Sequence, residues 1–143
     1  METESKLHIL LADDDKEDFY LFKEALKQLD PSVQLTHVED SVQLLKYLEE
    51  VEVPDVIVLD VHMPYKPVLE SLADIKTNEK FGHLPVIIFS TSGDKETIDA
   101  CYKAGATLYL VKPYTFPDLV NIIRKIVQTN WDKTAGSANT NAV

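Results

Sequence analysis

Three consecutive aspartates, Asp13, Asp14 and Asp15, are the first residues along the chain whose type and spacing indicate chemistry. They directly follow the apolar run at residues 7–12. Clustered carboxylates repel one another and resist joint ionisation, and a hard divalent cation relieves that repulsion. Mg²⁺ is the usual choice where a site offers one or two carboxylates, some waters and a phosphate oxygen. An aspartate can also act as a nucleophile and form an acyl phosphate.

Three further polar residues fit the same chemistry. Asp60, Ser90 and Lys112 each come directly after a short apolar run. An ammonium group and a divalent cation neutralise charge on phosphoryl oxygens, and a hydroxyl group can donate to them. If the apolar runs are neighbouring strands, these side chains and the first aspartates meet in one crevice, which predicts a phosphoryl-transfer site.

The apolar patterns predict strands and helices in strict alternation. Short apolar runs that end at polar residues are typical of buried strands, and apolar positions three and four residues apart are typical of helices. Such alternation predicts a parallel sheet with helices on both faces, where ligands bind at the carboxyl ends of the strands. The strands are expected at 7–12, 33–38, 56–59, 86–89 and 107–111, and the helices at 16–29, 41–51, 68–78, 94–104 and 116–129.

Composition limits the classes of protein to which the chain can belong. Its 143 residues fit one domain, expected at residues 1–131, and the small polar residues 132–143 are expected to form a disordered tail. The net charge of −10 argues against nucleic-acid binding, which requires a basic surface. The single Cys101 excludes an internal disulfide framework. No apolar run could span a membrane and no secretory signal is visible, so we expect a cytoplasmic protein.

Five segments in order resemble one known family. They cover the chain from about residue 7 to residue 129, and their combined order and spacing is specific. The sequence resembles the response-regulator receiver domain of two-component signalling, of the single-domain chemotaxis-regulator type. This resemblance implies a flavodoxin-like (βα)5 fold with a five-stranded parallel sheet of order 2-1-3-4-5. The segments are ILLADDD (9–15), VIVLDVHMP (56–64), PVIIFSTS (85–92), AGA (104–106) and YLVKP (109–113).

The resemblance also implies a metal site and a phosphoacceptor. Asp60 matches the aspartate that accepts the phosphoryl group. Asp14, Asp60 and the backbone carbonyl of His62 match the Mg²⁺ ligands, and Asp13 matches a residue that contacts the ion through water. The side chain of His62 stands at a position that tunes the rate of self-dephosphorylation in the family, as does Ser92.

Three further positions match residues that respond to the phosphoryl group. Ser90 and Lys112 match the hydroxyl and the amine that contact its oxygens, and Ser90 and Tyr109 match the two switch residues. The bond from Lys112 to Pro113 matches a cis peptide of the family. One departure concerns Val68, which stands near the usual position of a loop glycine. Because valine rarely adopts a positive φ, we expect an unusual loop path there.

The expected function is that of a stand-alone response regulator. A sensor histidine kinase or a histidine phosphotransfer protein supplies the phosphoryl group, and the protein is no enzyme beyond its own phosphorylation and dephosphorylation. No output domain follows residue 129, so the signal is expected to pass to a downstream protein or through a homodimer. The expected surface is the face formed by the fourth helix, the fifth strand and the fifth helix, with its aromatic residues Tyr102, Tyr109, Tyr114, Phe116 and Trp131.

Three alternatives stay open on the sequence alone. An aspartyl-phosphate phosphohydrolase also uses an aspartate and magnesium, but it carries a second acid two residues later, where this chain has His62. A flavin-binding protein of similar architecture needs a phosphate-binding loop after the first strand, where this chain has three aspartates that repel phosphate. A degenerate receiver could serve as a phosphorylation-independent adaptor, and Val68 keeps that reading open.

Overall fold

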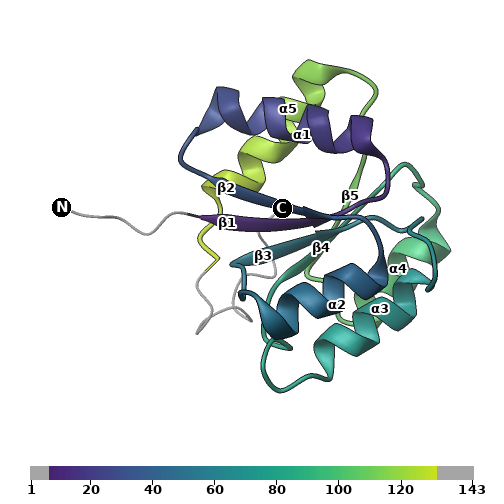
Figure 1. Cartoon of the computed structure of the whole chain (residues 1–143). Helices are drawn as coiled ribbons and strands as arrows, with labels where there is room; N and C mark the ends of the chain where they lie inside the picture. Colours follow the sequence, from purple (N-terminus) through teal and green to yellow (C-terminus); the bar gives the residue numbers. More distant parts are fainter. Residues whose placement is uncertain (1–6, 132–143) are drawn as a thin grey trace.

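The computed structural model describes residues 7–131 as a parallel five-stranded sheet of order β2-β1-β3-β4-β5. Helices α1 and α5 cover one face, and α2, α3 and α4 cover the other (Figure 1). The predicted disordered tail at 132–143 lies outside the described residues. The elements are β1 His8–Ala12, α1 Lys16–Leu29, β2 Gln34–Val38, α2 Ser41–Glu50, β3 Val56–Leu59, α3 Val68–Lys76, β4 Val86–Ser90, α4 Lys95–Lys103, β5 Leu108–Val111 and α5 Phe116–Gln128.

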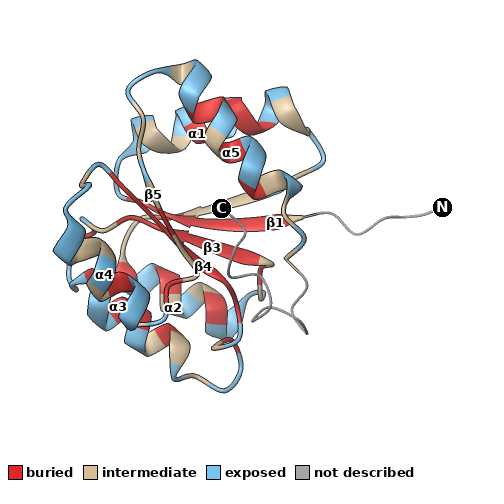
Figure 2. Ribbon diagram, turned by 180° about the vertical axis from the view of Figure 1, so that it is seen from behind, coloured by how far each residue is buried: buried red, intermediate tan, exposed pale blue. Residues whose placement is uncertain are grey.

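The central strands β1, β3 and β4 lie in the core, and Figure 2 shows them as buried along their length. Side chains alternate between the two faces of a strand. In β1, Leu10 and Ala12 therefore join the cluster under α2, α3 and α4, whereas Ile9 and Leu11 join the cluster under α1 and α5. This double burial explains why β1 and β3 read as unbroken apolar runs in the sequence.

Short polar side chains set the starts of four helices. The side chain of Asp15 caps α1, because it accepts hydrogen bonds from the amides of Glu17 and Asp18 at the start of that helix. Asp40, Asp94 and Thr115 cap α2, α4 and α5 in the same way. Because these caps are local, sequence patterns placed the helix starts within one residue.

The loop between β3 and α3 differs from the expectation based on Val68. Val68 is the first residue of α3 and its side chain is buried, so it does not carry a positive φ. The positive φ of this loop lies at Tyr65, with a value of 78°. Pro67 precedes the helix in an extended conformation. The loop therefore does contain a residue with a positive φ, but this residue is three positions before Val68, the position that the sequence indicated.

Several element boundaries also differ from the sequence predictions by one or two residues, as in α3 and β4. α3 ends at Lys76 rather than at residue 78, and Ser90 is the last residue of β4 rather than the first residue after it. Within residues 7–131, no helix combines the length and apolar character needed to cross a bilayer.

Gly105 follows α4 with a φ of 111°, so an alanine at this position should destabilise the fold. The new Cβ would also lie 3.0 Å from Cγ of Lys76. We expect Gly105→Ala to lower the free energy of unfolding by about 1–2 kcal/mol in urea denaturation. Gly93→Ala is the matched control, because its Cβ would meet only Cγ2 of Val111 at 4.0 Å. Equal losses in both variants would contradict this explanation.

Candidate functional site

The residues singled out in the sequence meet at the carboxyl edge of the sheet. Asp13 follows β1, Asp60 follows β3, and Ser90 ends β4, and all three side chains are buried. Lys112 follows β5 and its side chain is 11% exposed. Asp14, next to Asp13, is exposed. The structure thus brings together carboxylates, a hydroxyl and an ammonium that are distributed over 100 residues of sequence.

Strand pairing continues one residue beyond the strand ends and fixes the backbone at the site. The amide of Asp13 donates to the carbonyl of Val38 at 3.0 Å, and the amide of Asp60 donates to the carbonyl of Ala12 at 2.9 Å. The amide of Lys112 donates to the carbonyl of Ser90 at 2.8 Å. Because each functional residue is tied to a neighbouring strand, the relative positions of the side chains follow from the sheet.

Three carboxylates are arranged as ligands for a hard cation. One oxygen from each of Asp13, Asp14 and Asp60 can be chosen so that all lie within 4.8 Å of one another. Oxygen ligands of this type and number suit Mg²⁺, which retains several waters when it binds to proteins. His62, whose carbonyl is the further expected ligand, lies in the loop after β3. The donor set therefore fits the expected metal.

Lys112 is the positive counterpart of this acidic cluster. Its Nζ lies 3.1 Å from Asp13 and 3.6 Å from Asp60, and it lies 2.8 Å from Asp18. Burial by itself would lower the pKa of Lys112, but the hydrogen bond to Asp18 and the surrounding negative charges raise the pKa above its ordinary value. The lysine is therefore a permanent cation at this site.

Burial makes the negative charge of Asp13 unfavourable. Burial raises its pKa to about 6, and the neighbouring charge of Asp60 adds to that rise. A hydrogen bond from the amide of Asp15 and the charge of Lys112 act in the opposite direction. A bound divalent cation would favour the ionised form of the same carboxylate.

A chain of hydrogen bonds joins the two expected switch residues. Oγ of Ser90 accepts a hydrogen bond from the amide of Ser92 at 3.1 Å, and the hydroxyl of Tyr109 donates to the carbonyl of Ser92 at 2.7 Å. The amide of Tyr109 donates to the hydroxyl of Tyr102 at 2.9 Å. Ser92, expected to tune dephosphorylation, therefore lies between Ser90 and the buried Tyr109.

Sequence reasoning missed two residues that contact the site. Asp18, in the first turn of α1, forms the shortest ion pair of Lys112. Acidic residues are common in first turns because of the helix dipole, so the pattern gave no separate signal. His37 of β2 contacts the backbone carbonyl of Asp13 through Nε2 at 2.7 Å and stacks on Phe19.

One expectation at this edge of the sheet is wrong. The peptide bond between Lys112 and Pro113 is trans, because the described residues contain no cis peptide bond. The trans form is also the one that bonds before proline favour, by about 0.5–1 kcal/mol. The backbone hydrogen bond from Lys112 to Ser90 is present with this trans bond.

The raised pKa of Asp13 predicts a pH dependence of stability without metal. An aspartate with a higher pKa in the folded than in the unfolded chain binds protons more tightly when folded, so the free energy of unfolding falls as the pH rises from about 4 to about 6. In a chelating buffer, Asp13→Asn should therefore be more stable than the wild type by about 1–3 kcal/mol at pH 7.5. The difference should vanish near pH 4.

Denaturant titrations at the two pH values measure this difference. Asp99→Asn is the control, because Asp99 is an exposed residue of α4 that pairs with the exposed Lys95 of the same helix. Its effect should be a few tenths of a kcal/mol at either pH. A stabilisation by Asp13→Asn that is equal at both pH values would contradict the electrostatic explanation.

Comparisons with known proteins agree with this geometry. Residues 9–124 match the response regulator receiver domain family. The two-component response regulator ORR8 of Oryza sativa subsp. indica is 34% identical over 122 residues, which cover 85% of this chain and 99% of ORR8. Response regulator Rcp1 of Synechocystis is 30% identical over 132 residues, 88% of this chain and 89% of Rcp1.

Solved structures of response regulators are also similar to this chain. The phosphorylated cyanobacterial phytochrome response regulator RcpA aligns with a TM-score of 0.79 and 29% identity, over 85% of this chain and 91% of RcpA. The Mn²⁺-bound form of Rcp1 aligns with a TM-score of 0.78 and 29% identity, over 87% of this chain and 96% of that one. The fold is thus the flavodoxin-like receiver fold, and the chain belongs to the response regulator receiver domain family.

Proposed function

We propose that this protein is a stand-alone, cytoplasmic response regulator that accepts a phosphoryl group on Asp60 in a Mg²⁺-dependent reaction. The observation that carries the proposal is the grouping of Asp60 with two other carboxylates, all within 4.8 Å, and with the ammonium of Lys112. The receiver domain is taken to span residues 1–131. Its stand-alone character is supported by relatives such as ORR8, which the chain matches over 99% of their length.

Asp60 is the nucleophile in this proposal. A carboxylate oxygen attacks the phosphorus of a phosphohistidine on a sensor histidine kinase or a phosphotransfer protein. The new oxygen–phosphorus bond forms as the phosphorus–nitrogen bond breaks, and the histidine nitrogen leaves with the bonding electrons and takes up a proton. Asp60 is only 6% exposed, so the donor must present its phosphoryl group at the open edge of the site.

Asp14, Asp60 and the carbonyl of His62 would hold Mg²⁺, with Asp13 contacting it through water. When bound, the ion neutralises negative charge on the phosphoryl oxygens and on the carboxylates. A further support is the Mn²⁺ bound by the related Rcp1, which is 29% identical in that structure. Mn²⁺ and Mg²⁺ both favour oxygen ligands in octahedral arrangements.

Lys112 and Ser90 would bind the other phosphoryl oxygens. The ammonium of Lys112 is 3.6 Å from Oδ1 of Asp60, so a phosphoryl group on Asp60 would lie beside it. The hydroxyl of Ser90 is buried at the end of β4, the strand next to β3. Both groups can stabilise charge in the transition state as well as in the product.

The hydrogen-bonded chain from Ser90 through Ser92 to Tyr109 supports a switch. If the hydroxyl of Ser90 turns towards the phosphoryl group, its hydrogen bond from the amide of Ser92 is lost or weakened. The backbone of Ser92 can then shift, and because its carbonyl accepts the hydrogen bond of the Tyr109 hydroxyl, Tyr109 shifts with it. Rearrangement there would alter the face formed by α4, β5 and α5, which would bind a downstream protein or a second copy. His62 and Ser92, beside the site, would set the lifetime of the phosphorylated state.

The passive-adaptor alternative has no observation in its favour. It depended on Val68, which lies at the start of α3 without backbone strain. The carboxylates, the hydroxyl and the ammonium that the phosphoacceptor reaction needs all lie at one edge of the sheet.

Asp60→Asn tests the phosphoacceptor assignment. Incubated with acetyl phosphate and Mg²⁺, the wild type should gain the mass of one phosphoryl group, because a carboxylate at residue 60 can form an acyl phosphate. The variant should gain none, and a chelator should prevent the adduct in the wild type. Intact-protein mass spectrometry measures these outcomes.

The matched control for this experiment is Asp99→Asn, an identical chemical change at an exposed residue of α4. This variant should gain the adduct like the wild type. An adduct that persists in Asp60→Asn, or a wild type that is never modified by several donors, would sink the assignment.

Dimerisation through the α4–β5–α5 face is a separate expected outcome of phosphorylation. Tyr102 and Val111 are each 43% exposed on this face, and the adjacent Tyr114 is fully exposed. Light scattering should show a larger mass with Mg²⁺ and beryllofluoride, a phosphoryl analogue, than without them. Tyr102→Ser should reduce the gain, because large exposed aromatic residues contribute strongly to interfaces. A monomeric mass in both states would exclude the homodimer.

A further inference from the structure

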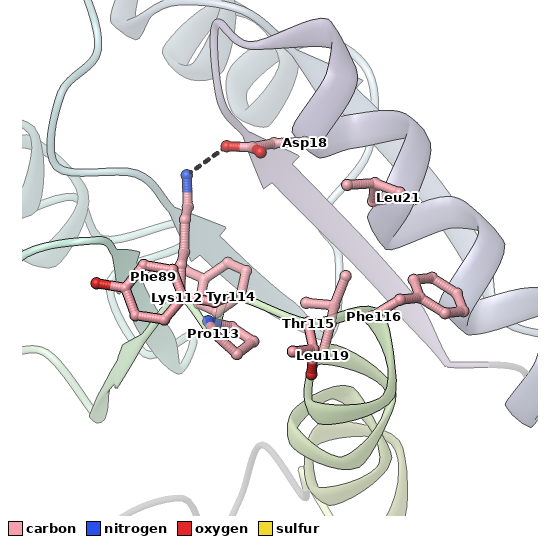
Figure 3. A pocket seen from close by; sticks show the side chains of 9 residues that line it. All are labelled: Asp18, Leu21, Phe89, Lys112, Pro113, Tyr114, Thr115, Phe116 and Leu119. Atoms are coloured by element: carbon pink, nitrogen blue, oxygen red, sulfur yellow. Dashed lines mark hydrogen bonds and ion pairs between the residues drawn. The ribbon is translucent and has the colours of Figure 1, made fainter.

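Asp18 is a third carboxylate partner of Lys112 that neither the sequence motifs nor the family pattern singled out. Its Oδ2 lies 2.8 Å from Nζ of Lys112, closer than the oxygens of Asp13 at 3.1 Å and of Asp60 at 3.6 Å. Figure 3 shows the ammonium of Lys112 directed at Asp18 of α1, and both residues line a cavity of about 100 Å³. The lysine thus hydrogen-bonds to Asp13 and Asp18 but lies too far from Asp60 for a hydrogen bond.

The backbone of Asp18 is held firmly. Its amide donates to the capping side chain of Asp15 at 3.2 Å, and α1 packs against α5. The carboxylate is therefore presented to Lys112 by a fixed helix turn rather than by a mobile loop. The fold therefore holds Asp18 in position to pair with Lys112.

The two carboxylates that hydrogen-bond to Lys112 differ in the energetic cost of losing this contact. The side chain of Asp13 is 2% exposed, so separating it from the lysine leaves a buried charge. The side chain of Asp18 is 36% exposed, so its carboxylate can return to water when the lysine moves away. Asp18 is therefore the partner that Lys112 can exchange for a phosphoryl oxygen at low cost.

We propose that Asp18 is a competing counter-ion that positions Lys112 in the unmodified protein and thereby weakens the affinity of the site for a phosphoryl group on Asp60. The inference rests on the proposed function. Two effects of Asp18 lower this affinity. Its carboxylate competes with the phosphoryl oxygens for the ammonium of Lys112, and its negative charge repels the phosphoryl oxygens. Asp18 thus sets how readily the modified state forms and how stable that state is.

Beryllofluoride binding in saturating Mg²⁺ tests this proposal, measured by isothermal titration calorimetry on the full chain. Asp18→Asn should bind beryllofluoride roughly 3- to 10-fold more tightly than the wild type, because the lysine is freed and a negative charge is lost. Asp18→Ala should show the same direction of change. Asp18→Glu keeps the charge and should stay close to the wild-type affinity.

Glu17→Gln is the matched control. Glu17 is the exposed neighbour in the same helix turn, and the substitution removes one negative charge without touching Lys112. It should change the affinity by less than about twofold. Thermal unfolding of every variant checks that differences in affinity do not arise from differences in folding.

The outcomes distinguish a failure of the role of Asp18 from a failure of the phosphoacceptor function. Tighter binding in Asp18→Asn and Asp18→Ala, with the control unchanged, supports the competing role of Asp18. Unchanged or weaker binding in Asp18→Asn overturns it, as does an equal gain in Glu17→Gln, which would reflect net charge alone. A wild type that binds no beryllofluoride overturns the phosphoacceptor function itself, and the role of Asp18 with it.

Discussion

The ammonium of Lys112 lies within 3.6 Å of oxygens from three carboxylates, and the arrangement of the site depends on this crowding. Asp13 and Asp60 are almost completely buried, and buried like charges are costly without a cation. One lysine cannot neutralise all of them, and the excess negative charge is what makes the site suited to a divalent metal. Burial raises the pKa of Asp13 to about 6, and the neighbouring charge of Asp60 adds to that rise.

The sheet makes this crowding unavoidable. Parallel strands end at a common edge, and backbone hydrogen bonds extend the pairing one residue further to Asp13, Asp60 and Lys112. The strands are buried on both faces by two separate apolar clusters, so the edge cannot relax without disturbing the core. The charged groups are therefore held together by apolar packing that acts far from them.

The parts of the site differ in how firmly they are held. The buried aspartates are fixed by strand pairing. The side chains of Ser90 and Tyr109, in contrast, are linked through hydrogen bonds to the backbone of Ser92 in the loop after β4. Lys112 has a long side chain and partners of unequal exposure, which leaves it free to change partner. A switch that responds to phosphorylation needs fixed groups that bind the phosphoryl group and a few side chains that can change their hydrogen-bond partners.

Residue patterns were enough to predict the alternation of strands and helices and the polar groups that follow each strand, and the family resemblance supplied the strand order. Apolar periodicity and helix caps are local properties, so α1, β1 and β3 were placed almost to the residue. Val68 was a misleading signal, because local sequence cannot show which loop residue absorbs a positive φ, and the fold places it at Tyr65. Local sequence could not predict the contact between Asp18 and Lys112, because this ion pair joins residues 94 positions apart and forms when the fold brings them together. The physical reason is that an acid in a first helical turn looks like an ordinary response to the helix dipole until packing brings a distant charge to it.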